Sequence, residues 1–149
     1  MKQFLWIMFV TMLFACGSNT QDEANKLLEQ ANKQFESHQY DKALASIDSL
    51  RRVYPGAIDT RKKALALQQA IELKRTQEEL AIVDSMLQAV NHDYNYQKQK
   101  VEKDKAALRA TADELTMLTQ TRIRRDSLQT QWEVLGAKIK YIRKKQKEQ

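Results

Sequence analysis

The sequence has few residues that break helices or cross-link chains. Its 149 residues include three glycines, one proline and one cysteine. A single cysteine excludes a disulfide within the chain, so the fold cannot depend on a disulfide framework. Few glycines and prolines mean few turns, and the abundance of Ala, Leu, Gln, Lys and Glu favours helix almost throughout. We therefore expect an all-α protein.

Residues that could carry chemistry are also scarce. There are two histidines. His38 lies in a polar segment, and His92 is followed by Asp93 but has no second His or Cys at a helical spacing of three or four, as a metal site would need. The chain has no glycine-rich phosphate loop, no Gly-x-Ser-x-Gly elbow and no His-Glu-x-x-His. We expect neither an enzyme nor a bound cofactor or metal.

The first fifteen residues have the pattern of a secretory signal. Lys2 provides a positive charge, Phe4 to Phe14 form an apolar run broken only by Thr11, and the small residue Ala15 precedes Cys16. A permanent membrane helix would need about 20 apolar residues, more than this run provides. We therefore expect residues 1–15 to be removed after export.

Leu13-Phe14-Ala15-Cys16 also resembles the lipobox of bacterial lipoproteins, although Phe14 is bulkier than usual at its position. The resemblance implies that Cys16 receives a diacylglycerol thioether and often an acyl chain, such as palmitate, on its new amino group. Gly17 is not the aspartate that retains lipoproteins in the inner membrane, so the resemblance implies the outer membrane. The alternative is an ordinary cleaved signal followed by an incidental cysteine. Residues 16–23 would form a polar tether.

Positive charge is concentrated at the C-terminal end. Residues 122–149 contain nine Lys and Arg against three acids, a balance of +6, whereas residues 16–121 contain fifteen against sixteen, a balance of −1. Cations near the end of a helix complement its dipole and stay solvated. Alternatively they contact an anionic partner, which in an exported protein would be lipid headgroups, cell wall or an acidic protein rather than nucleic acid. The candidate contact residues are Lys138, Lys140, Arg143, Lys144, Lys145 and Lys147.

Two short amphipathic helices are expected between residues 24 and 54. Apolar residues recur at i, i+3, i+4 and i+7 from Ala24 to Phe35 and again from Tyr40 to Tyr54. A polar corner, residues 37–39, separates the two stripes, and Pro55-Gly56 ends the second. This pattern predicts an αα-hairpin.

The hairpin resembles a tetratricopeptide repeat. The resemblance covers residues 24–55 and is carried by Leu27, Ala31, the run Tyr40-Asp41-Lys42-Ala43-Leu44, Ile47 and Pro55. Gln34 and Leu50 depart from the repeat pattern. The resemblance implies a peptide-binding groove around Phe35, Tyr40 and Tyr54. One repeat does not bury its faces alone, so we expect a packing helix, capped by Asp59 or Thr60, to complete a unit spanning residues 24–74.

A coiled-coil arm is expected over residues 75–149. An alternating +3, +4 spacing predicts a first seam, and the same spacing in a shifted register predicts a second. We interpret the shift, at Thr119 to Asp126, as the turn of an antiparallel helical hairpin. A rival turn is Asn91 to Tyr96, whose residues form helix poorly, and pairing between chains as a homo-oligomer is a further alternative. The first seam comprises Leu80, Val83, Leu87, Val90, Tyr94, Gln97, Val101, Asp104, Leu108, Thr111, Leu115 and Leu118; the second comprises Leu128, Trp132, Leu135, Ile139 and Ile142.

The triplet Asp-Ser-Leu/Met occurs three times and resembles the O-glycosylation signal of exported proteins in some Gram-negative lineages. The candidate acceptors are Ser49, Ser85 and Ser127. The alternative is that Asp-Ser simply occupies the solvated side of a helix.

These patterns together predict a lipid-anchored scaffold or adaptor of the cell envelope that binds another protein. A spacer that contacts cell wall or anionic membrane through its basic end is the alternative. A regulator of a hydrolase is a weaker third hypothesis.

Overall fold

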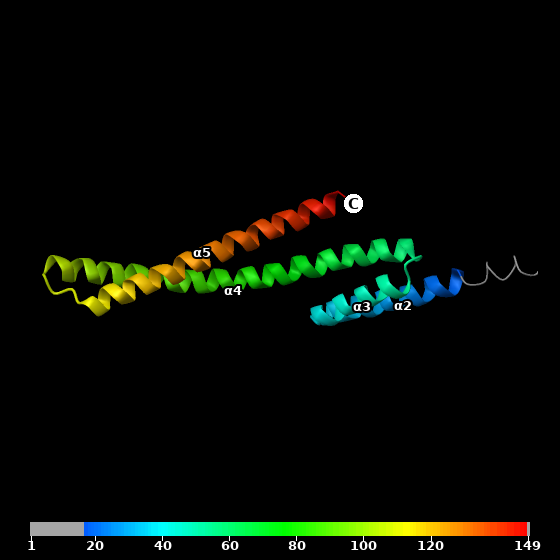
Figure 1. The fold of residues 1–149 in the computed structure, drawn as a ribbon, viewed down its shortest axis with the longest axis horizontal. Helices are drawn as coiled ribbons and strands as arrows, with labels where there is room; N and C mark the ends of the chain where they lie inside the picture. The colour runs from blue at the N-terminus through cyan, green and yellow to red at the C-terminus, as the bar shows by residue number, and fades with distance from the viewer. Residues whose placement is uncertain (1–16, 149) are drawn as a thin grey trace, which may run out of the picture. The chain divides into compact units, whose positions relative to one another are not determined.

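A computed structural model describes residues 17–148. These residues form helices α2 (Gly17–Glu36), α3 (Tyr40–Val53), α4 (Ile58–Ala106) and α5 (Ala112–Lys147), with no strand among them (Figure 1). The expectation of an all-α fold is confirmed. The described chain divides into two compact units between Glu72 and Leu73, inside α4. Each unit is described by itself below.

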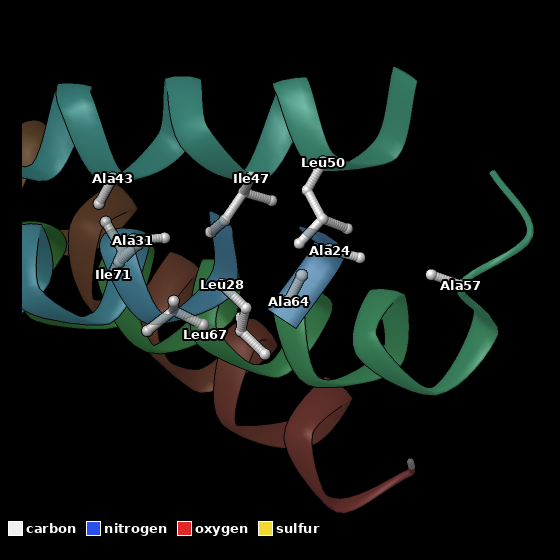
Figure 2. Packing of buried hydrophobic residues seen from close by; sticks show 10 residues of the cluster. All are labelled: Ala24, Leu28, Ala31, Ala43, Ile47, Leu50, Ala57, Ala64, Leu67 and Ile71. Carbon is white, nitrogen blue, oxygen red and sulfur yellow. The ribbon is translucent and has the colours of Figure 1, made fainter. Parts of the chain in front are cut away.

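The first unit packs α2, α3 and the start of α4 around one apolar core. Small residues at the α2–α3 contact, Ala31 and Ala43, are fully buried and allow the two helices to approach closely. Figure 2 shows the side chains of this core, which are Ala24, Leu28, Ala31, Ala43, Ile47, Leu50, Ala57, Ala64, Leu67 and Ile71.

The corner between α2 and α3 falls at residues 37–39, where the sequence predicts it. The amide of Gln39 donates to the carbonyl of Gln34 at 2.8 Å, which closes the end of α2. His38 has a positive φ of 58°, a conformation that costs a non-glycine residue energy. Its Nδ1 lies 2.8 Å from the Tyr40 hydroxyl, so the imidazole helps to hold the corner.

Polar side chains connect α2 to the start of α4. The Thr60 hydroxyl is completely buried, donates to Asn25 Oδ1 at 2.7 Å and accepts from the Gln21 amide. The prediction that Asp59 or Thr60 caps this helix is wrong, because α4 begins at Ile58 and Thr60 lies inside it. Residues 17–23, expected to be a tether, form the first turns of α2.

In the second unit α5 runs back alongside α4 (Figure 1). Helix α4 continues without a break through residues 91–96, as the spacing of the first seam indicates and against the weak helix propensity of that segment. Leu80 packs at the edge of the core, whose buried residues are Val83, Leu87, Val90, Leu128 and Leu135.

The turn of this hairpin lies at residues 107–111. The prediction of a turn at Thr119 to Asp126 is wrong, because those residues are helical and belong to α5. Helix α5 starts with a capping box: the Glu114 amide donates to Thr111 Oγ1 at 3.3 Å, and the Thr111 amide donates to Glu114 Oε2 at 2.9 Å. Leu108, placed in the seam by its spacing, is instead 96% exposed in the turn.

The apparent shift of register has a simple origin. On α5 the less exposed positions keep a continuous +4, +3 spacing from the first turn onward, so no slip occurs within the helix. Polar residues occupy several of these positions, which hid the pattern in the sequence. The positions are Glu114, Leu118, Thr121, Arg125, Leu128, Trp132, Leu135, Ile139 and Ile142.

Candidate interaction surfaces

The described residues offer no assembled metal site. Within residues 17–148 no group of three His, Cys, Asp or Glu side chains could hold a metal ion. None of the helices described is both long enough and apolar enough to cross a bilayer. Exposed surfaces are the functional candidates described below.

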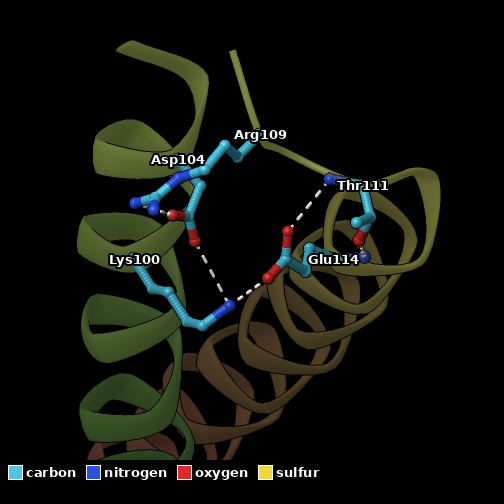
Figure 3. Close-up of polar contacts among 5 residues, drawn as sticks. All are labelled: Lys100, Asp104, Arg109, Thr111 and Glu114. Atoms are coloured by element: carbon cyan, nitrogen blue, oxygen red, sulfur yellow. Dashed lines mark hydrogen bonds and ion pairs between the residues drawn. The ribbon is translucent and has the colours of Figure 1, made fainter. Parts of the chain in front are cut away.

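A network of charged side chains holds the turn between α4 and α5 (Figure 3). Lys100 bridges Glu114 across the two helices and lies 3.3 Å from Asp104, while Arg109 contacts the same aspartate at 3.3 Å. The hydrogen bond from Lys100, followed by that from the Thr111 amide, lowers the pKa of Glu114 from its ordinary 4.5 to about 2. The turn is therefore fixed by named polar partners.

Two further polar pairs lie along the seam beyond this network. The Arg125 guanidinium lies 4.1 Å from the centre of the Tyr94 ring. Its hydrogen bond to Asp126 raises the pKa of Arg125 above the ordinary value. The Thr121 hydroxyl contacts Gln97 Oε1 at 2.9 Å. Because each pair forms in only one alignment of the helices, these contacts fix the register of α5 on α4.

A groove of about 360 Å³ opens between α4 and α5 near the turn. Tyr96 is 66% exposed and Met117 is 54% exposed beside it. The groove is lined by Asp93, Tyr96, Gln97, Lys100, Val101, Glu114 and Met117.

An exposed row of side chains on α4 leads into this groove. The row follows the seam at heptad spacing, +4, +3, +4, +3, and consists of Ile82, Met86, Ala89, Asp93 and Tyr96. Ile82 is 63% exposed and Met86 41%. The sequence analysis does not predict this row, although its members are readable in the sequence as a second line of mostly apolar residues, each one position before a residue of the first seam.

The predicted aromatic groove is not assembled as one site. The Phe35 and Tyr40 rings meet at the α2–α3 corner, with centroids 6.0 Å apart. Tyr54 follows the last residue of α3, fourteen helical residues beyond Tyr40, or about 20 Å along the axis. All three rings are half-buried against the core of the first unit.

The basic residues near the end of α5 are all exposed. Lys145 lies 2.9 Å from Glu148 and 5.9 Å from the centre of the Tyr141 ring, which is itself 61% exposed. Lys144 approaches Glu148 at 3.9 Å. The other four candidates are Lys138, Lys140, Arg143 and Lys147, so cations surround the last turns of the helix.

The remaining predicted sites are separate from one another. Ser85 and Ser127 are exposed and Ser49 is half-buried, each within a regular helix. Cys16 and the signal lie outside the described residues.

Comparisons of the chain with protein-family models, with curated proteins and with solved structures gave no match. The resemblances to a lipobox and to a tetratricopeptide repeat therefore stay predictions. The functional argument depends on the surfaces themselves.

Proposed function

We propose that this protein is a lipid-anchored adaptor of the cell envelope that binds a helix of another protein along its α4–α5 hairpin. The exposed row from Ile82 to Tyr96, which is apolar except for Asp93 and ends in the groove, is the observation that supports the proposal. In a two-helix hairpin each helix buries one apolar seam against the other helix. A second, mostly apolar row on the same helices therefore has no helix of the hairpin to pack against. Rows of this kind mark contact sites on soluble proteins.

The chemistry of the partner follows from the spacing of the row. Ile82, Met86 and Tyr96 lie at heptad intervals, which is how a helix presents side chains to another helix. The groove adds a buried floor at Val101 and a charged rim at Asp93 and Lys100. A partner helix with its own apolar stripe fits this surface and completes a three-helix arrangement.

Photo-crosslinking in living cells tests this proposal. A photoreactive side chain at Tyr96 faces the groove, whereas the same group at the exposed Lys98, about 200° further around the helix axis, lies on the opposite side of α4 from Tyr96. We expect a single adduct from Tyr96 and none from Lys98. Equal yields at both positions, or no adduct at Tyr96, would contradict the proposal. An adduct of twice the chain's own mass would identify the partner helix as a second copy of the chain.

The anchor is tested separately. If Cys16 carries lipid, a Cys16→Ala variant leaves the membrane fraction and the native chain stays in it. Recovery of the variant in the membrane fraction would overturn the anchor and leave the helix-binding surface untouched.

The exposed cations at the end of α5 support the second candidate, a spacer that contacts an anionic surface. Charge reversal of Lys144 and Lys145 is expected to weaken binding to anionic vesicles or to isolated cell wall. Unchanged binding would remove this candidate.

A further inference from the structure

The end of the first unit at which the described chain begins can be identified from its hydrogen bonds. Thr60, in the first turn of α4, contacts Gln21 and Asn25 in the early turns of α2. Gly17 lies four residues before Gln21, about 6 Å along the helix axis. The start of α2, the end of α3 and the start of α4 therefore lie together at one end of this unit.

This end is basic. The run from Arg51 to Lys63 carries five cations and one carboxylate, Asp59, a balance of +4. Four of the cations are exposed and Arg51 is half-buried. The nearby acids are Asp48, which faces Arg52 at 3.9 Å, Asp22, and Glu23, which pairs with Lys26 at 2.8 Å, so the balance of this end with its neighbours counted is +2. The cations are Arg51, Arg52, Arg61, Lys62 and Lys63.

Apolar side chains project among these cations. Val53 is 61% exposed and Ile58 is 63% exposed, on either side of the bend between α3 and α4. A groove of about 400 Å³ lies beside them, where Ile58 and Leu65 alternate with cations, Arg51, Arg61 and Lys62. Val53 and Ile58 do not contribute to the core of the unit, so core packing does not explain why apolar residues occupy these positions.

We propose that this end of the first unit, which we call the entry surface (Arg51–Val53 and Ile58–Lys63), lies against the anionic surface of a bilayer. Val53 and Ile58 enter the interfacial region, and the surrounding Lys and Arg side chains contact lipid phosphates. The inference depends on the proposed lipid anchor, because it is the covalent bond from residue 16 to Gly17 that brings this end to the membrane.

Charge and connectivity favour a bilayer over a protein as the occupant. Each Lys or Arg close to an anionic membrane strengthens attachment roughly fivefold, and segments that bind anionic lipid typically carry a cluster of about four to eight such residues. The run from Arg51 to Lys63 contains five. The two exposed apolar residues lie on opposite sides of a bend, which suits a broad interface better than a narrow pocket. The residue bonded to Gly17 is the predicted lipid attachment site, so headgroups are the nearest surface.

Spin labels in native membranes test the proposal on the full chain. Ile58→Cys places a label on the entry surface, and Gln39→Cys places a matched label on the exposed α2–α3 corner at the other end of the same unit. We expect the label at position 58 to be reached by oxygen and shielded severalfold from a water-soluble nickel complex. The label at position 39 should be reached by nickel.

Two outcomes at position 58 would overturn the inference. Nickel access equal to that at position 39 places the surface in water. Shielding from both oxygen and nickel means that another protein covers it. A label at Val53, which is also exposed, repeats the measurement if the first substitution disturbs the fold.

Charge reversal adds a second readout. Lys62→Glu with Lys63→Glu is expected to restore nickel access at position 58 severalfold, whereas Lys42→Glu, near the start of α3, leaves it unchanged. If the reversal has no effect, the cations do not hold this surface to the bilayer and the proposal fails.

The labelling itself separates this inference from the anchor. Cys16 is the one native cysteine, so the unsubstituted chain takes up label only if that thiol is free. Labelling of the unsubstituted chain contradicts the anchor. An unlabelled native chain whose position 58 lies in water contradicts the entry surface alone.

Discussion

The two halves of the α4–α5 seam are built from different chemistry. Away from the turn the contact is apolar, with Val83, Leu87 and Val90 against Leu128 and Leu135. Toward the turn polar pairs predominate beside the buried Val101: Lys100 with Glu114, Gln97 with Thr121, and Tyr94 with Arg125.

The difference between the halves indicates that the stability of the hairpin and the register of its helices depend on different contacts. Apolar burial supplies most of the free energy of folding but tolerates sliding, since leucines replace one another in a shifted alignment. Polar pairs contribute little net energy but form in only one alignment. The apolar half therefore holds the helices together and the polar half aligns them.

The largest effect is expected in the apolar half. Leu135 is 8% exposed, so Leu135→Ala should lower the free energy of unfolding by about 2–4 kcal/mol through lost burial and the cavity left behind. Leu115→Ala on the same helix, where the side chain is 37% exposed, should cost less than about 1 kcal/mol. Urea unfolding measures both, and equal losses would mean that Leu135 does not belong to a packed core.

The polar half should respond differently, because its energy depends on pairing. Thr121→Val leaves Gln97 Oε1 without its donor and should cost about 1 kcal/mol. Adding Gln97→Leu removes the orphaned amide and should restore most of that loss. If the double variant loses as much unfolding free energy as the two single variants lose together, the pair is not coupled.

Acid should weaken the turn through Glu114. Its pKa is held at about 2, below the ordinary 4.5, so the folded state favours the carboxylate. The stabilisation is fully present above pH 4.5 and is lost as pH falls toward 2. The difference in unfolding free energy between the native chain and Glu114→Gln should shrink over this window. Lys100→Met, which removes the main cause, should show the same shrinkage; a difference that stays constant with pH would contradict the assignment.

The smallest effect concerns the backbone of the two corners. His38 and Leu108 both have positive φ, 58° and 55°. Leu108→Gly should stabilise the chain by up to about 1 kcal/mol, because the exposed leucine makes no compensating contact. His38→Gly should gain less, since it also removes the contact with Tyr40. Thermal unfolding measures the gain in stability of both variants, and a larger gain for His38→Gly than for Leu108→Gly would contradict this interpretation.

Apolar spacing predicted the helical class, the α2–α3 corner and the continuity of the helix through residues 91–96, but not that the packing helix and the first seam form one helix, α4. It failed where polar residues take seam positions, at Glu114, Thr121 and Arg125, because periodicity counts only apolar side chains. The signal for the true turn was present in the sequence as Thr111-x-x-Glu114, a capping box before a helix. Local chemistry at a helix start locates a turn better than an apparent change of register.

The candidate surfaces were harder to predict for a different reason. Phe35, Tyr40 and Tyr54 are half-buried, and the helix predicted from Tyr40 to Tyr54 already separates the third ring from the first two, so the groove implied by the repeat resemblance conflicted with the predicted hairpin. The row from Ile82 to Tyr96 is readable in the sequence as a spacing pattern, but its exposure is known only from the structure, where α5 covers the neighbouring seam. Which of two apolar lines is buried depends on the partner helix.

The position of the polar pairs also bears on how the second unit folds. Lys100 and Glu114 are 14 residues apart in sequence and Gln97 and Thr121 are 24 apart, whereas Val83 and Leu135 are separated by 135 − 83 = 52. Shorter loops close at lower entropic cost. We therefore expect the aligning contacts to form before the apolar half closes, so that the register is set near the turn first.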